Sequence, residues 1–177
     1  MKVGANGWIS GVRRIASPNY DIRPPGTAID ILVIHNISLP PGEFGGKAIT
    51  QLFTNTLDTE AHPHYAQLQG LKVSAHFLIR RDGGIIQFVP CGKRAWHAGV
   101  SQWQGRSGCN DFSVGVELEG SDYVAFSDQQ YKALVRLTRR LQRAYPIRAI
   151  VGHDTVAPGR KTDPGPCFDW QRYFAAL

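Results

Sequence analysis

The sequence predicts a single α/β domain of the α+β kind, in which helices flank a central mixed β-sheet. Residues 30–35 form a short run rich in apolar and β-branched side chains, typical of a strand covered on both faces. Two more apolar runs flank Asp82-Gly83, a hairpin signal that predicts an antiparallel pair. Residues 127–145 have the periodicity of an amphipathic helix.

The length of 177 residues fits one domain over 1–177, and no repeat, linker or low-complexity tract divides it. The formal net charge is +6 and the sequence pI is about 9.5, which favours anionic partners. The basic residues form scattered short pairs, and no recognisable nucleic-acid motif accompanies them. We therefore expect no nucleic-acid partner.

Three cysteines without a CxxC pair argue against a disulfide framework and agree with a reducing compartment. The first residues contain no continuous apolar signal core, and no stretch approaches the roughly 18 apolar residues of a membrane span. These features predict a cytoplasmic protein with no membrane partner. A monomer is the default expectation for such a compact domain.

In the first half of the chain, residues 1–29 are rich in Gly, Pro, Asn and Ser, so we expect an irregular N-terminal arm. The strand at 30–35 then ends at His35, and a Pro- and Gly-rich loop follows at its carboxyl end, where ligands often bind in α/β folds. Residues 48–57 are expected to form a short helix, and 58–70 an irregular segment.

In the second half, residues 74–80 and 85–90 form the predicted hairpin. Residues 91–111 carry Trp96, His97 and Trp103 in a long loop that is aromatic enough to line a ligand cleft. Residues 112–118 read as a strand whose alternation places Glu117 opposite an apolar face. Ser127 and Gln130 form a capping box at the start of the long helix; residues 149–152 form a strand, and 168–177 a closing helix.

Three potential zinc ligands lie at strand ends or on a rigid loop. His35 and His153 each follow a short apolar strand, and Asp163 lies ten residues after His153 on a loop stiffened by prolines. Imidazole nitrogen and carboxylate oxygen suit Zn²⁺, and a catalytic zinc site has three protein ligands and an open position. The alternative makes His35 a satisfied strand-end histidine and Asp163 a turn residue that accepts its own backbone N–H.

Two further residues suit hydrolytic chemistry. A carboxylate such as Glu117 can take a proton from an attacking water molecule, and a fixed cation such as Lys161 can stabilise a developing oxyanion. Considered alone, Glu117 is a salt-bridge partner and Lys161 a solvated loop residue.

Five stretches in this order resemble one enzyme family: VIHNISLPPGEFGG, SAHFLIRRDGGIIQFVP, RAWHAGVSQWQGR, CNDFSVGVELEG and GHDTVAPGRKTDPGP. The chain is similar from about Gly7 to its end to the AmpD-type N-acetylmuramoyl-L-alanine amidases. These zinc enzymes of bacterial wall recycling are related to the peptidoglycan recognition proteins and to a phage lysozyme-like amidase. The resemblance implies their fold.

The resemblance implies one zinc ion per chain, bound by His35, His153 and Asp163, with Glu117 as the catalytic carboxylate and Lys161 as the oxyanion donor. It also implies a muramoyl-peptide substrate with a 1,6-anhydro sugar, cut between the lactyl carbonyl and L-alanine in the cytoplasm. Blocks that line the family's cleft contain three candidate substrate contacts: Asn36, Trp96 and Arg106. A Trp face covers a sugar ring, an Asn amide binds a peptide group and an Arg fork binds a carboxylate.

Two other classes of function stay open. A peptidoglycan-binding module that does not cut its ligand commonly lacks a complete zinc set, whereas this chain contains all three ligands. A basic nucleic-acid-binding protein predicts salt-sensitive retention on DNA without hydrolysis. A purely structural zinc is disfavoured, because such sites are usually closed by four Cys or His ligands.

Overall fold

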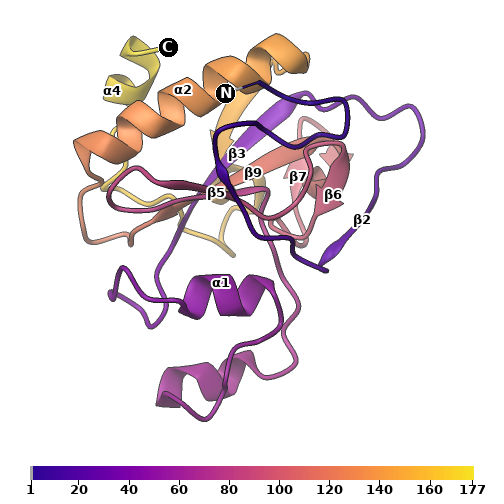
Figure 1. Cartoon of the computed structure of the whole chain (residues 1–177). Coiled ribbons are helices and arrows are strands. Elements are labelled where there is room, and N and C mark those ends of the chain that lie inside the picture. Colours follow the sequence, from indigo (N-terminus) through magenta and orange to yellow (C-terminus); the bar gives the residue numbers. More distant parts are fainter. Residues whose placement is uncertain (1) are drawn as a thin grey trace.

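A six-stranded sheet in the order β1-β5-β4-β9-β3-β10 runs through the middle of the molecule (Figure 1). The computed structural model describes residues 2–177. Strands β3, β9, β4 and β10 pair in parallel, and β4 pairs with β5 antiparallel through the predicted Asp82-Gly83 hairpin. The sheet is therefore mixed, as the sequence predicts. Its strands are β1 (Arg13–Arg14), β3 (Ile31–Ile37), β4 (Phe77–Ile79), β5 (Ile85–Gln87), β9 (Ser113–Glu119) and β10 (Ala149–Gly152).

Short elements surround this sheet. Two small antiparallel pairs join β2 (Tyr20–Ile22) to β6 (Lys93–Ala95) and β7 (Gln102–Trp103) to β8 (Arg106–Ser107). The α-helices are α1 (Ala48–Phe53), α2 (Asp128–Ala144), α3 (His153–Val156) and α4 (Trp170–Ala175), and the 3-10 helices are η1 (Pro63–Leu68) and η2 (Cys109–Asp111). In residues 2–177 no helix is both long and apolar enough to cross a bilayer.

Helices cover both faces of the sheet (Figure 1). One face packs its alternate strand residues, such as Ile34, Val116 and Leu118, against α2. The opposite face packs Leu78 and Ile86 against α1. Residues at even and odd positions of a strand point to opposite faces, so His35 and Glu117 lie on the face turned away from α2.

Helix α2 forms as the sequence predicts. Ser127 accepts from the backbone N–H of Gln130 at 3.1 Å, and the Gln130 side chain accepts from the backbone N–H of Ser127 at 3.0 Å, which completes the capping box. Its apolar side packs on the sheet, and the arginines of its other side are exposed to solvent. The helix ends before Pro146, whose ring is incompatible with a continued helix.

The N-terminal arm is more regular than predicted. Residues 13–14 add β1 to the edge of the main sheet beside β5, and 20–22 form β2. Backbone hydrogen bonds from Ile15 to Gln87 and from Ser17 to Phe88 continue the first pairing. These strands arise from contact with distant segments, which a composition rich in Gly and Pro does not reveal.

Three other expectations also need correction: strand β3 continues two residues beyond His35, residues 63–68 form η1, and the loop at 91–111 contains β6, β7, β8 and η2.

Candidate metal centre

Three neighbouring parallel strands bring three polar side chains into one row. His35 on β3 lies in register with Glu117 on β9, and Ile34 lies in register with Gly152 on β10. His153 follows Gly152 directly as the first residue of α3, so it stands beside His35. Residues in register on parallel strands point to the same face, so this row is a direct consequence of the strand pairing.

Asp163 joins the two histidines from the loop after α3. The three distances between Nδ1 of His35, Nδ1 of His153 and Oδ2 of Asp163 are all 3.0 Å. The histidines are 1% and 3% exposed, whereas Asp163 is partly exposed. Three donor atoms are therefore gathered at one point, and the carboxylate is on the side that water can reach.

This triangle fits a zinc ion. Donors bound tetrahedrally at about 2.0–2.2 Å lie about 3.3–3.6 Å from one another, so a slight widening would satisfy the geometry. Nε2 of His153 lies 3.2 Å from the carbonyl oxygen of Ala98, which only accepts, so it carries the proton of the neutral ring. The lone pair of Nδ1 then points at the Asp163 carboxylate. Because both atoms carry electron pairs and neither has a proton to donate, a cation between them would bind to both.

The surroundings favour the protonation states that metal ligands need. Burial by itself raises the pKa of Asp163, but the close contacts with His153 and His35 outweigh burial and hold the pKa below its usual range. Burial lowers the pKa of His35 despite the hydrogen bond to Asp163. The site thus combines a carboxylate with neutral imidazole, the forms that bind divalent metals.

Glu117 is a buried carboxylate with an unpaired oxygen. It is 8% exposed, and no described residue donates a hydrogen bond to its Oε2. Burial and the negative charge of Asp163 raise the pKa of Glu117 well above 4.5, whereas Lys161 lowers it. Lys161 itself is exposed on the loop between α3 and Asp163, close enough for its charge to act on Glu117 and His35. A carboxylate in this position can accept and return a proton.

Asn36 is engaged inside the protein. Its amide donates to Oδ1 of Asp122 at 2.7 Å and to the carbonyl oxygen of Pro164 at 3.1 Å. It therefore ties the end of β3 to the turn that follows Asp163. In this structure Asn36 helps to place a ligand, and its predicted contact with substrate stays a prediction.

The other two predicted substrate contacts lie in different places. Trp96 directly precedes His97, and its Nε1 donates to Oδ2 of Asp21 at 2.6 Å. Arg106 donates to Asp30 at 3.0 Å, at the opposite end of β3 from His35. Asp30 lies five positions before His35, which corresponds to about 16 Å along an extended chain. The structure therefore pairs the Trp96 indole with Asp21 and places Arg106 away from the histidine cluster, and both substrate contacts stay predictions.

His97 belongs to the centre, although the sequence indicated only an aromatic loop. Its Nδ1 lies 2.9 Å from Nε2 of His35, and its Nε2 lies 3.0 Å from Oγ of Ser113. Burial and the neighbouring histidines lower the pKa of His97 well below 6.5, so the ring is neutral. The contact joins segments 62 residues apart, and no local motif marks it.

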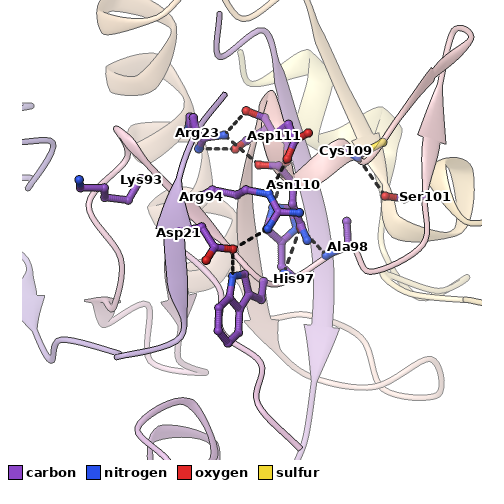
Figure 2. Close-up of polar contacts among 12 residues, drawn as sticks. Asp21, Arg23, Lys93, Arg94, His97, Ala98, Ser101, Cys109, Asn110 and Asp111 are labelled. Atoms are coloured by element: carbon purple, nitrogen blue, oxygen red, sulfur yellow. Dashed lines mark hydrogen bonds and ion pairs between the residues drawn. The ribbon is translucent and has the colours of Figure 1, made fainter. Parts of the chain in front are cut away.

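Arg23 from the N-terminal arm is the second important residue that no sequence pattern marks. Arg23 is 8% exposed, and its side chain lies beside the segment that carries His97 (Figure 2). Burial lowers the pKa of Arg23 to about 10. It donates to four backbone carbonyl oxygens, those of Cys91, Asn110, Asp111 and Ser113. The arm is thereby fastened to the segments that surround the centre.

The family model and the relatives that match this chain are N-acetylmuramoyl-L-alanine amidases. Residues 25–166 match the family described as N-acetylmuramoyl-L-alanine amidase. The 1,6-anhydro-N-acetylmuramyl-L-alanine amidase AmpD of Escherichia coli strain K12 is 59% identical over 169 residues, which cover 94% of this chain and 92% of that protein.

Solved structures agree with the sequence matches. A crystal structure of a selenomethionine derivative of AmpD has a TM-score of 0.97 at 55% identity, covering 100% of this chain and 99% of that one. The Escherichia coli amidase AmiD, in complex with anhydro-N-acetylmuramic acid-L-Ala-D-γ-Glu-L-Lys, has a TM-score of 0.61 at 31% identity. That alignment covers 98% of this chain and 65% of the AmiD chain.

Proposed function

The chain belongs to the N-acetylmuramoyl-L-alanine amidase family, and we propose that its substrate is a 1,6-anhydro-N-acetylmuramoyl peptide. It hydrolyses the amide bond between the lactyl group of the sugar and the L-alanine of the stem peptide. The observation that carries this proposal is the row of His35, His153 and Glu117 with Asp163 opposite, which gathers three metal donors and a free carboxylate on one sheet face. The names of the high-identity relatives support the anhydro sugar.

His35, His153 and Asp163 would hold one zinc ion. Bound zinc supplies Lewis-acid polarisation of the scissile carbonyl and a water molecule activated near neutral pH. The chain's own part begins with Glu117, whose unpaired Oε2 accepts a proton from the attacking water and later returns it to the departing alanine nitrogen. Burial raises the pKa of Glu117, so its carboxylate is a stronger base than an exposed glutamate and its carboxyl group can hold the proton until the nitrogen departs.

Lys161 and the proline-rich loop complete this proposal. The Lys161 ammonium would stabilise the negative charge that develops on the carbonyl oxygen. The loop that carries Lys161 is anchored at Asp163 and Pro164, because the backbone N–H of Asp154 donates to the carbonyl oxygen of Asp163 at 2.9 Å and Asn36 donates to that of Pro164. We further propose a monomeric cytoplasmic enzyme of peptidoglycan recycling, with no nucleic-acid or membrane partner, as the sequence leads us to expect.

Incubation of the zinc-loaded protein with 1,6-anhydro-N-acetylmuramoyl-L-Ala-D-γ-Glu-L-Lys, followed by mass spectrometry, tests the proposal. We expect free tripeptide and free 1,6-anhydro-N-acetylmuramic acid, and no products after treatment with a chelator. A parallel incubation with the ordinary N-acetylmuramoyl peptide measures the strictness for the anhydro sugar. Intact substrate that remains bound to the protein would instead identify a recognition module.

A further inference from the structure

His97 forms the middle of a buried chain of side chains that begins at a proposed zinc ligand. Nε2 of His35 lies 2.9 Å from Nδ1 of His97, and Nε2 of His97 lies 3.0 Å from Oγ of Ser113. The exposed fractions of these residues are 1%, 9% and 0%. Each contact therefore lies where bulk water offers no substitute partner.

Asn110 and Gly115 hold the His97 ring in place. Oδ1 of Asn110 accepts from the backbone N–H of His97 at 3.1 Å and from that of Ala98 at 2.8 Å (Figure 2). The ring lies directly over Gly115 of β9, where a Cβ atom would overlap its Cγ and Nδ1. Only glycine leaves room for the ring at this point, so the position of His97 depends on the absence of a side chain there.

The hydrogen-bonded series His35–His97–Ser113 determines which nitrogen of His35 carries the proton. A neutral imidazole has one N–H and one lone pair, and a metal ligand must present the lone pair. If Nδ1 of His35 faces the metal, Nε2 carries the proton and needs an acceptor. Nδ1 of His97 is that acceptor, provided that the His97 proton is on Nε2, where Oγ of Ser113 accepts it.

The two histidine ligands differ in this respect. Nε2 of His153 faces the carbonyl oxygen of Ala98 at 3.2 Å, which accepts whatever the state of the site. Nε2 of His35 faces another imidazole, which accepts or donates according to its own tautomer. The metal-binding tautomer of His35 thus depends on the tautomer of His97, which in turn depends on the contact with Ser113.

We propose that His97 is a positioning residue that fixes His35 in the metal-binding tautomer, and that Ser113 fixes His97 in turn. The proposal rests on the zinc site of the proposed function and deepens it. Partners behind metal-ligating histidines orient the ring and raise its basicity, and their loss commonly weakens metal binding by about 10–100-fold.

Zinc affinity tests the proposal, measured by competition with a chromophoric chelator on chelator-dialysed protein. His97→Phe keeps a ring of similar size without an acceptor, and we expect its zinc dissociation constant to rise by about 10–100-fold. His97→Asn keeps a side-chain oxygen at about the place of Nδ1, and we expect an affinity within a few-fold of the wild type. An unchanged affinity for His97→Phe, or an Asn variant as weak as the Phe variant, overturns the proposal.

Two further measurements separate the possible causes. Chemical denaturation of the metal-free variants shows whether they remain folded, and affinities are compared only under conditions where they are. In the zinc-loaded wild type, ¹⁵N NMR should detect a scalar coupling across the hydrogen bond between Nε2 of His35 and Nδ1 of His97. A spectrum that places the His35 proton on Nδ1 would contradict the proposal, and this test needs no variant. If the wild type itself binds no zinc, the proposed function fails; if it binds zinc with or without the His97 acceptor, only this inference fails.

Discussion

Replacement of Glu117 by Gln is expected to have opposite effects on activity and on stability. The side chain keeps its shape but can no longer take up or release a proton. General acid–base catalysis contributes about 10²–10⁴-fold, so we expect turnover of the anhydromuramoyl tripeptide to fall by that factor, or about 3–5 kcal/mol in the activation barrier. The rate of tripeptide release, followed by mass spectrometry at saturating zinc, measures this effect.

The stability of the metal-free protein should rise in the same variant. Burial raises the pKa of Glu117 above 4.5, so over the interval between 4.5 and the raised pKa the folded chain holds a proton that the unfolded chain has lost. Stability from this group is therefore complete below about pH 4.5 and is lost as the pH rises through the folded pKa. Once the pH exceeds the folded pKa, the ionised carboxylate is buried with Oε2 unpaired, a penalty of about 1–3 kcal/mol that Gln largely removes.

Glu119 provides the matched control, because it is a second buried carboxylate two residues further along β9. Its oxygens are fully engaged: Arg80 donates at 2.7 Å, and the backbone N–H groups of Gly45 and Arg81 donate at 2.7 and 3.2 Å. Glu119→Gln should lower the free energy of unfolding by about 1.5–3 kcal/mol, the contribution of a hydrogen bond to a charged group. Urea denaturation from pH 5 to 8 distinguishes the two variants. A Glu117→Gln protein that is less stable than the wild type at pH 8, or that turns over substrate normally, would refute the reasoning.

The remaining predictions concern the framework. Ser127→Ala removes half of the capping box at the start of α2 and should cost about 1 kcal/mol in urea denaturation; an unchanged midpoint would mean that the cap does not support the helix. Arg23→Met leaves four carbonyl oxygens without their donor and should lower the free energy of unfolding by about 3 kcal/mol or more. Arg106→Met removes an exposed ion pair with Asp30 and should cost less than about 1 kcal/mol, so similar losses in the two arginine variants would contradict the assigned role of Arg23.

Features of the fold that depend on local chemistry were predictable from the sequence. The capping box of Ser127 and Gln130 needs only residues three apart, and the Asp82-Gly83 hairpin needs a turn between two apolar runs. The strand that carries His35 is recognisable because its apolar run is buried on both faces. In each case the decisive interactions lie within a few residues of one another.

Features that depend on distant contacts were not predictable. Strand β1 exists because β5 offers it a free edge, and the arm has no strand pattern of its own. Arg23 reads as an ordinary arm residue until its guanidinium reaches backbone carbonyl oxygens 68 to 90 positions away. Similarly, no spacing rule identifies His97 as the partner of His35.

The candidate site shows the same division. Spacing alone left His35, His153 and Asp163 as three suggestive residues, and the family resemblance was needed to connect them. The parallel register of β3 and β10 gives the physical reason why His35 and His153 meet, whereas Asp163 reaches them from the loop after α3. Arg106, which the resemblance placed among the substrate contacts, pairs with Asp30 at the far end of β3, and its contact with substrate stays a prediction.

A crystal structure of the zinc-loaded protein, with anomalous diffraction recorded at the zinc absorption edge, tests the central claim most directly. We expect one anomalous peak per chain, within bonding distance of Nδ1 of His35, Nδ1 of His153 and a carboxylate oxygen of Asp163. Glu117 should lie close to the peak without binding it. A peak at another group of residues, such as the surface histidines His62 and His64, or a zinc ion bound by Glu117 in place of Asp163, would contradict the account.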